Sequence, residues 1–240
     1  MILGLGFELP IGLSEPVALR HLPDPRAGVV AGPDLGPWLK RRKDARLLPR
    51  AAELALPAAG VAMRGFTGNP EELGIFVAVG REPPDEGDAE ASLVAMGRGG
   101  ELDLEALRGE GRALYPPLLP LRTLPNMILA HVAIQHGIRG ENAVFAGGAE
   151  AGHHAWEAAC AALAEGRCDA ALVGAALSAV DLASARDRLR LGRAGAPGEG
   201  AIFVLLGAPM PLPPHAEGEW AARVGDVGPV GAFLGLIPPG

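Results

Sequence analysis

Cysteine and aromatic residues are scarce in this chain of 240 residues, which holds two Cys, one Tyr, six Phe and three Trp. Cys160 and Cys168 are spaced for neither a disulfide framework nor a Cys-x-x-Cys metal or redox pair, so we expect reduced, intracellular thiols. The N-terminus lacks a positively charged leader, and no apolar run is long enough to cross a membrane. These absences predict a soluble, cytoplasmic protein without a membrane span.

An excess of positive charge is missing as well. The formal net charge is -7, so the chain lacks the basic surface that neutralises phosphates in nucleic-acid binding or at anionic membranes. Gly and Pro are abundant, at 35 and 23 residues, but 49% of the chain is hydrophobic, which is too much for a solvated coil. We therefore expect packed elements joined by turns, and no nucleic-acid partner.

The first half of the chain contains two apolar segments typical of buried strands. Residues 2–9 predict a short buried strand, and Leu73–Val79 reads LGIFVAV, as a strand covered on both faces does. Between them, residues 37–60 predict an amphipathic helix that is interrupted or restarted near Pro49. A strand buried on both faces favours an α/β fold with a mixed, mainly parallel sheet covered by helices.

The middle of the chain predicts irregular structure and then a buried helix. Residues 81–100 indicate a surface loop with one helical turn near 89–96, and residues 102–107 a short helix. The proline-rich segment 115–125 predicts an extended connection, because each Pro removes a backbone donor. Residues 126–138 then predict a buried helix, with Asn126 as its N-cap and Gly137 as its stop.

A strand–helix–strand unit follows. The pattern predicts strands at Asn142–Ala146 and 170–173, with a helix at 152–165 between them and a sharp turn at Gly147-Gly148. A further strand is expected at 201–206, and one more at 220–224. Many enzymes place a nucleophile at such a strand-to-helix turn, but here only the carboxylate of Glu150 could attack a carbonyl, and only weakly.

The known motifs for metals, nucleotides and serine nucleophiles are not found. The close His pairs, His131 with His136 and His153 with His154, point their side chains in diverging directions on a helix. Gly4-Leu5-Gly6 lacks the third glycine of a dinucleotide-binding turn, and neither a P-loop nor a Gly-x-Ser-x-Gly occurs. We expect no cofactor and no metal site.

Five blocks of the chain, in order, resemble the β-ketoacyl synthases of the thiolase-like superfamily. ILGLGFELPIG is similar to the family's opening strand and turn, and LGIFVAVG to a later strand. The most specific block runs from Asn126 to Leu177 and resembles the segment that holds the active-site cysteine. The resemblance implies the N-terminal half of a thiolase-like fold: a single ketosynthase-like domain over 1–240, with an irregular strand and tail at about 207–240. The remaining two blocks are KRRKDARLLPRAAELAL, similar to the first long helix, and LGRAGAPGEGAIFVLL, similar to a glycine-rich turn and strand.

The resemblance places Ala149 at the position of the family's nucleophilic cysteine. A methyl group cannot form an acyl thioester, so the condensation chemistry is expected to be lost. The two histidines of the family's C-terminal half are not present either. A scaffold without the nucleophile resembles the chain-length factors, the noncatalytic partners of ketosynthases in type II polyketide and aryl polyene pathways. We therefore expect no enzymatic activity from this chain alone.

The resemblance also implies partners and a tunnel. A catalytic ketosynthase would form a heterodimer with this chain through Asn142, Ala143, Val144, Phe145 and Ala146, and an acyl carrier protein would interact with the complex. Tyr115, Leu118 and Leu119 would form the gate of an acyl tunnel. A half-fold with such apolar helices should also expose an apolar patch that a large interface covers.

Two alternatives remain open at this stage. The chain could be a malonyl decarboxylase or priming subunit, although Ala149 stands where those proteins carry Gln and the Glu150 carboxylate would repel a forming enolate. It could also be a ketosynthase-like scaffold or carrier-protein dock, with the basic cluster Lys40–Lys43 meeting an acidic carrier.

Overall fold

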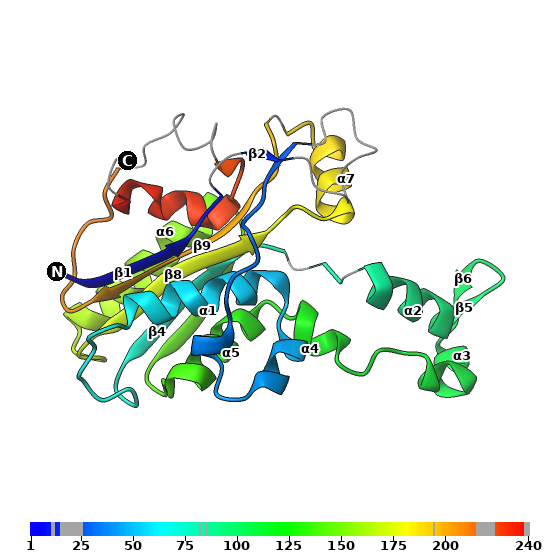
Figure 1. Cartoon of the computed structure of the whole chain (residues 1–240), viewed down its shortest axis with the longest axis horizontal. Helices are drawn as coiled ribbons and strands as arrows, with labels where there is room; N and C mark the ends of the chain where they lie inside the picture. Colours follow the sequence, from blue (N-terminus) through cyan, green and yellow to red (C-terminus); the bar gives the residue numbers. More distant parts are fainter. Residues whose placement is uncertain are drawn as a thin grey trace.

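The computed structural model describes residues 1–10, 13–14, 26–81, 83–84, 86–193, 195–214 and 224–237. In this part of the chain, one five-stranded sheet lies between two layers of helices, and an elongated arm projects from one end (Figure 1). The predicted strand at 220–224 falls mostly outside the described residues.

The sheet has the order β1-β9-β8-β4-β7. Strands β8 and β4 are parallel, as are β4 and β7, whereas β9 is antiparallel to both β8 and β1. Strands β1, β8, β4 and β7 therefore share one direction, and the mainly parallel sheet is confirmed. The bounds are Ile2–Glu8 for β1, Gly74–Val79 for β4, Asn142–Ala146 for β7, Ala171–Ser178 for β8 and Glu199–Leu206 for β9.

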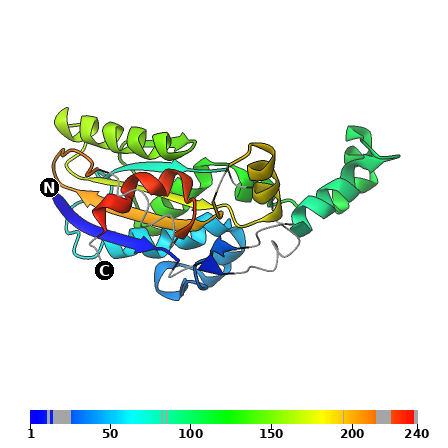
Figure 2. The same ribbon diagram turned by 90° about the horizontal axis from the view of Figure 1, so that it is seen from above.

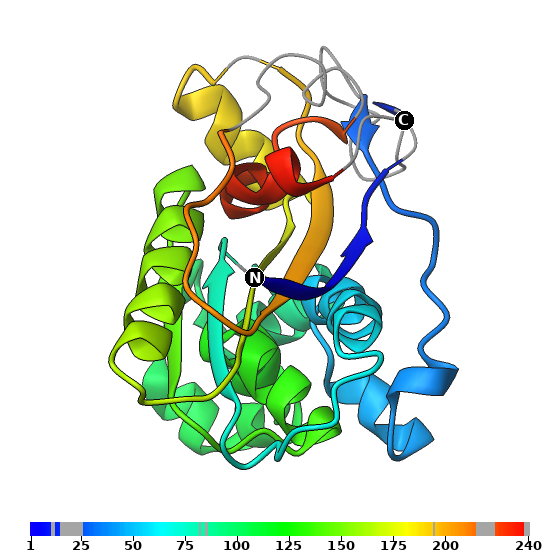
Figure 3. The ribbon, with the colours of Figure 1, turned by 90° about the vertical axis from the view of Figure 1, so that its left-hand side faces the viewer.

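The central strands are buried along their whole length because both faces of the sheet are covered. Helices α1 (Arg50–Ala62) and α5 (Asn126–His136) pack on one face, where they meet side chains such as Ile75 and Leu172. Helix α6 (Ala149–Ala164) and the 3-10 helix η5 (Gly228–Leu236) pack on the other, against Phe76 and Val173. Figure 3 shows η5 and α6 on one side of the sheet and α1 on the other. Alternate residues of each strand thus serve two separate cores.

The arm consists of residues 86–113 and lies outside these layers. It contains α2 (Glu86–Met96), the hairpin of β5 (Gly97–Arg98) and β6 (Glu101–Leu102), α3 (Leu104–Arg108) and η4 (Glu110–Ala113). Helix α4 (Leu119–Thr123) leads from the arm back to α5. An ion pair between Asp88 and Arg122 joins the two chain segments at the base of the arm. Figure 2 shows the arm leaving the body at the end away from the N-terminus.

The remaining elements are short. Two two-residue strands, β2 (Leu13–Ser14) and β3 (Ala27–Gly28), pair with each other, and two 3-10 helices, η2 (Gly36–Trp38) and η3 (Arg42–Leu47), precede α1. Helix α7 (Leu182–Arg190) follows β8.

One of the strand predictions needs correction. The strand at the N-terminus exists, but it lies at the edge of the sheet with Ile2, Leu3 and Phe7 exposed, so it is not a buried strand. The predicted strand–helix–strand unit is confirmed as β7, α6 and β8, with β4 between its two parallel strands in the sheet.

Three predictions for the middle of the chain also need correction. Residues 81–100 hold the eleven-residue helix α2 instead of one helical turn. The segment 115–125 contains α4, because Pro120 sits in the first turn, where a missing N–H costs no hydrogen bond. Pro125, not Asn126, is the N-cap of α5, and it makes no side-chain hydrogen bond, whereas Gly137 ends the helix in the left-handed conformation as predicted.

Candidate functional site

The turn between β7 and α6 is the centre of the site. The N–H of Gly147 donates to the carbonyl of Val79, which fixes the turn to the end of β4, and α6 begins at Ala149. The Glu150 side chain folds back over this turn, so that its Oε1 accepts a hydrogen bond of 2.9 Å from the N–H of Gly148. A Cβ added at Gly147 or Gly148 would come within 2.9 Å of that carboxylate, so a side chain at either position would require Glu150 to shift.

The carboxylate of Glu150 stays ionised at the start of α6. Hydrogen bonds from the N–H groups of Gly148 and of Glu150 itself hold its pKa below the ordinary value, and the charges of His154 and Arg193 act in the same direction. A helix N-terminus attracts negative charge, so the Glu150 carboxylate interacts favourably with the N-terminal end of its own helix. The anion-binding end of α6 therefore faces a carboxylate of the same chain.

A cavity of about 620 Å³ lies beside this turn. It opens at the carboxyl ends of β4, β7 and β8, the edge at which α/β sheets commonly bind ligands. Its apolar wall includes Pro125, Leu177, Ala179, Leu191 and Pro229. Its charged wall consists of Arg81, Glu150, Asp187, Arg188, Arg193 and Asp226.

Four of the six residues of the charged wall form ion pairs that involve α7. Arg81, after β4, pairs with Asp187, and Arg188 pairs with Asp226, just before η5. Burial raises the pKa of Asp226, but hydrogen bonds from Arg188 and from the N–H of Gly228 outweigh burial, so the pKa lies below its ordinary value. Three arginines and three carboxylates thus balance around the cavity.

The residues predicted for the partner interface form β7, which lies at the edge of the described sheet. Only its side toward β4 is paired within the described residues. Val144 and Phe145 are partly buried, and Asn142 and Ala146 are exposed. The location at an edge is compatible with a strand that adds to a partner's sheet, and the interface itself stays a prediction.

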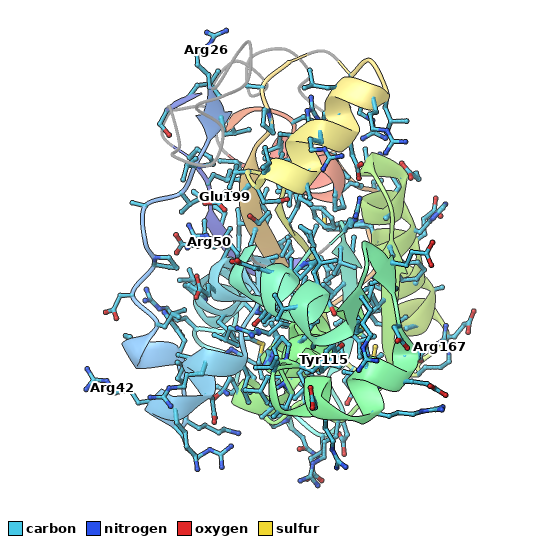
Figure 4. The ribbon with its side chains drawn as sticks, turned by 90° about the vertical axis from the view of Figure 1, so that its right-hand side faces the viewer. Arg26, Arg42, Arg50, Tyr115, Arg167 and Glu199 are labelled. Atoms are coloured by element: carbon cyan, nitrogen blue, oxygen red, sulfur yellow. The ribbon has the colours of Figure 1, made fainter. Side chains whose placement is uncertain are left out.

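The predicted gate residues lie elsewhere. Tyr115 is partly buried between η4 and α4, Leu119 begins α4, and Leu118 is 37% exposed. None of the three is among the residues that line the 620 Å³ cavity. Figure 4 shows Tyr115 on the side of the molecule from which the arm projects. Their role as a gate stays a prediction.

The basic cluster Lys40–Lys43 packs in part against α5. The backbone N–H of Lys40 donates to Oε1 of Gln135 at 2.7 Å, and its Nζ donates to the carbonyl of Ile134. Arg41 pairs with Asp44, whereas Arg42 and Lys43 are exposed. Figure 4 shows Arg42 at the opposite end of the fold from α7.

The four histidines that the structure describes form no common site. Burial lowers the pKa of His131 and of His136, both on α5, and the Nε2 atoms of both lack a hydrogen-bond partner. His154 instead lies beside the ring of Phe145. Within the described ranges, no three His, Cys, Asp or Glu side chains gather as a metal site. None of the helices in those ranges has the length and apolar character to span a bilayer.

Sequence reasoning missed the charged wall of the cavity. Arg81, Asp187, Arg188 and Asp226 come from three separate segments, and the sequence patterns single out none of them as a site residue. The only signal was the alternation of charges in RDRLR at 186–190, which does not identify its partners.

The chain was compared with known proteins. No curated protein sequence matches it. Residues 40–200 match the family described as β-ketoacyl synthase, N-terminal domain. This match covers more than half of the chain and includes the turn, α6 and α7.

Three solved structures share the fold. A type II polyketide synthase acyl carrier protein in complex with its ketosynthase bound to the hexaketide has a TM-score of 0.65 at 14% identity, covering 86% of this chain and 61% of that one. The ishigamide ketosynthase/chain length factor has a TM-score of 0.58 at 22% identity, with 85% and 60% covered. A β-ketoacyl synthase from Burkholderia phymatum STM815 has a TM-score of 0.61 at 17% identity, with 86% and 58% covered.

These likenesses concern the fold, since all three identities lie below 25%. The present chain spans about three fifths of each of the three related chains. The thiolase-like fold predicted from the five sequence blocks is thereby confirmed as a partial ketosynthase fold. By its sequence match and its architecture, the chain belongs to the β-ketoacyl synthase N-terminal domain family.

Proposed function

We propose that this chain is a noncatalytic, chain-length-factor-like subunit. It pairs with a catalytic ketosynthase and shapes the acyl tunnel in polyketide, aryl polyene or fatty-acid-like biosynthesis. One observation carries the proposal: the first residue of α6, where the resemblance places the nucleophilic cysteine, is Ala149.

The chemistry around Ala149 supports a noncatalytic role. Its methyl group offers no lone pair to an acyl group, so a thioester cannot form there. The neighbouring Glu150 carboxylate accepts the N–H of Gly148, at the helix end where a developing oxyanion would otherwise be stabilised. A second negative charge beside that carboxylate would be repelled, which also argues against decarboxylation through an enolate.

Two surfaces support a protein partner. Strand β7 ends the described sheet with backbone groups on its outer side that a second strand can pair with. The arm and its base carry half of the large apolar side chains that are exposed in the described part of the chain. The exposed residues of the arm and its base are Leu93, Val94, Leu102, Leu104, Leu114, Leu118, Leu121 and Leu124. Scattered exposed apolar residues are normal, but a concentrated set marks an interface. We therefore place the ketosynthase on the side of the molecule that carries the arm.

Relatives of the same fold give this partner a precedent. One of the similar structures is a ketosynthase/chain length factor, and another is an acyl carrier protein in complex with its ketosynthase. We accordingly propose that an acyl carrier protein reaches this chain through the heterodimer. Tyr115, Leu118 and Leu119 lie at the base of the arm, on the proposed partner side, where a tunnel gate between two subunits would have to be.

The test is co-expression with a ketosynthase encoded beside this chain. We expect a stable one-to-one heterodimer by size-exclusion chromatography with mass determination, and product formation by the pair from malonyl carrier protein. Replacing the nucleophilic cysteine of the ketosynthase should abolish product formation, because this chain has Ala149 in place of a nucleophile.

Three outcomes of these experiments would contradict the proposed function. Product formation without the ketosynthase cysteine would show that this chain is catalytic. Carbon dioxide release from malonyl carrier protein by the chain alone, lost in Glu150→Gln, would identify a decarboxylase instead. A monomer or homodimer that ignores the ketosynthase would point to a scaffold.

A further inference from the structure

Helix α7 is weakly packed for an element that forms a wall of the cavity. Only its Ala185 is buried, in a small cluster with Ala27, whereas Leu182 and Leu189 are exposed. In the described part of the chain, α7 shares no extended packing interface with another helix or strand. Figure 1 shows it at the outside of the fold, beyond the end of the sheet. Among the described residues, hydrophobic contact therefore contributes little to its position.

Polar contacts hold α7 in place instead. We name the Arg81–Asp187 and Arg188–Asp226 ion pairs the latch pairs. They tie α7 to two different neighbours, the segment after β4 and the segment before η5. Arg188 also donates to the carbonyl of Gly195 at 3.1 Å. At the other end, Asp181 caps the helix by accepting the N–H of Ser184 at 2.9 Å.

The latch pairs lie on the cavity. Asp187 and Arg188 both line it, together with Ser184 from the same helix, and so do their partners Arg81 and Asp226. Moving α7 outward would thus break the latch pairs and remove one wall of the cavity, while the sheet and both of its cores would remain intact. Gly192, with a φ of 60°, lets the chain turn just after the helix.

We propose that α7 is a hinged cover of the cavity at the α6 N-terminus, which the latch pairs hold closed. Segments with little apolar burial open at the lowest cost in free energy, and exposed ion pairs are weakened by salt. The cover governs access to the cavity whether or not a ketosynthase is bound, so it does not rest on the proposed function.

The experiment measures access through a cysteine placed beneath α7. Ala179 lines the cavity and is partly buried, so Ala179→Cys in the full chain provides the probe. Its reaction with N-ethylmaleimide is followed by peptide mass. The buried native Cys168 serves as an internal reference, because its modification reports global unfolding.

Neutralising both latch pairs with Asp187→Asn and Asp226→Asn should raise the modification rate at position 179 by about threefold to tenfold. The Arg81–Asp187 pair is exposed and weak, while Asp226→Asn also removes the charge that compensates the largely buried Arg188. The rate at Cys168 should not change. Raising salt from about 0.05 to about 0.5 M should open the parent in the same way and have little effect on the double variant. The matched control is Arg139→Gln, which breaks the exposed Arg139–Glu71 pair far from the cavity and should change nothing.

Hydrogen exchange on the unmodified chain gives a second measurement that needs no variant. The amides of 182–190 should exchange faster at high salt, while those of β8 and α6 should not. An unchanged rate at position 179 in the double variant, or a rise that Cys168 shares, would overturn the proposal. So would an equal effect of Arg139→Gln.

Discussion

Glu199 is a fully buried carboxylate at the start of β9. It accepts hydrogen bonds from the N–H of Val30 at 3.0 Å, from Ser178 Oγ at 2.9 Å and from two nitrogens of Arg50, the shorter at 2.7 Å. Figure 4 shows Arg50 and Glu199 next to each other. One side chain thus joins the segment after β3, the start of α1 and the end of β8. Because all of these partners donate hydrogen bonds, they compensate the negative charge of the carboxylate, which is buried away from water.

Removing this carboxylate should be costly. Glu199→Ala leaves the Arg50 guanidinium without its main partner, and we expect a loss of about 3–5 kcal/mol in the free energy of unfolding, measured by urea denaturation. Glu53→Ala is the matched control, because Glu53 pairs with the same Arg50 but is about one third exposed. Its cost should be about 0–1 kcal/mol. Equal losses in both variants would contradict the role assigned to Glu199.

Among the elements, β1 and α1 approach each other unusually closely. A Cβ added at Gly4 would lie 2.0 Å from the carbonyl oxygen of Ala62, and one at Gly6 would lie 2.1 Å from that of Ala58. The Gly-x-Gly of the first strand therefore serves helix packing, since both glycines let α1 approach the strand backbone.

A methyl group at this contact should separate the two elements. Gly6→Ala is expected to lower the free energy of unfolding by about 1–3 kcal/mol, the usual cost of overpacking, because the contacted atom belongs to the backbone of α1. Urea unfolding measures the loss. Gly32→Ala is the control, since nothing lies within 4 Å of a Cβ at that position. A neutral Gly6→Ala would show that β1 is free to shift.

Prediction from sequence succeeded where burial dictated the residue pattern. Strand β4 and strand β9 were found because side chains on both of their faces face a core, and Gly137 was found because a left-handed helix end selects glycine. The 3-10 helix η5 carries no such periodicity, yet Phe233 packs against Trp156. Burial of a short irregular segment depends on its neighbours, which local sequence does not specify.

The sequence predicts only those parts of the candidate site whose residues are consecutive in the chain. The turn at Gly147-Gly148 and the position of Ala149 follow from local pattern and resemblance, because strand, turn and helix are consecutive. The cavity wall depends on pairs such as Arg81 with Asp187, which are 106 positions apart. Charged residues on loops have many possible partners, so only the folded chain brings the correct ones together.

At the scale of the whole molecule, the arm stands apart because it lies outside the sheet and its two layers of helices. Its helices bury little more than Ala95, Ala106 and Gly111, so the arm has almost no core of its own. Leu93 and Val94 on α2 are 60% and 61% exposed. The exposed apolar residues of the arm therefore form a candidate contact surface for the proposed partner.

Charge on the arm should therefore weaken assembly and leave the body folded. Under the proposed function, Leu93→Glu with Val94→Glu should reduce co-purification of the proposed ketosynthase partner by at least about tenfold, because each charge would be buried without a partner at the proposed interface. The matched control is Ile134→Glu, a side chain that is 58% exposed on α5. Circular dichroism should show the same helix content in all three proteins. Undiminished co-purification would exclude the arm from the interface.

The pairing of β1 with β9 has a consequence for how the chain is made. The N–H of Gly207 donates to the carbonyl of Met1, so the two ends of this ladder come from segments separated by almost the whole sequence. During translation β1 is made before β9 and cannot pair until β9 has been synthesised. This edge of the sheet is thus completed late, and slow elongation through residues 199–206 would prolong the interval in which β1 lacks its partner strand.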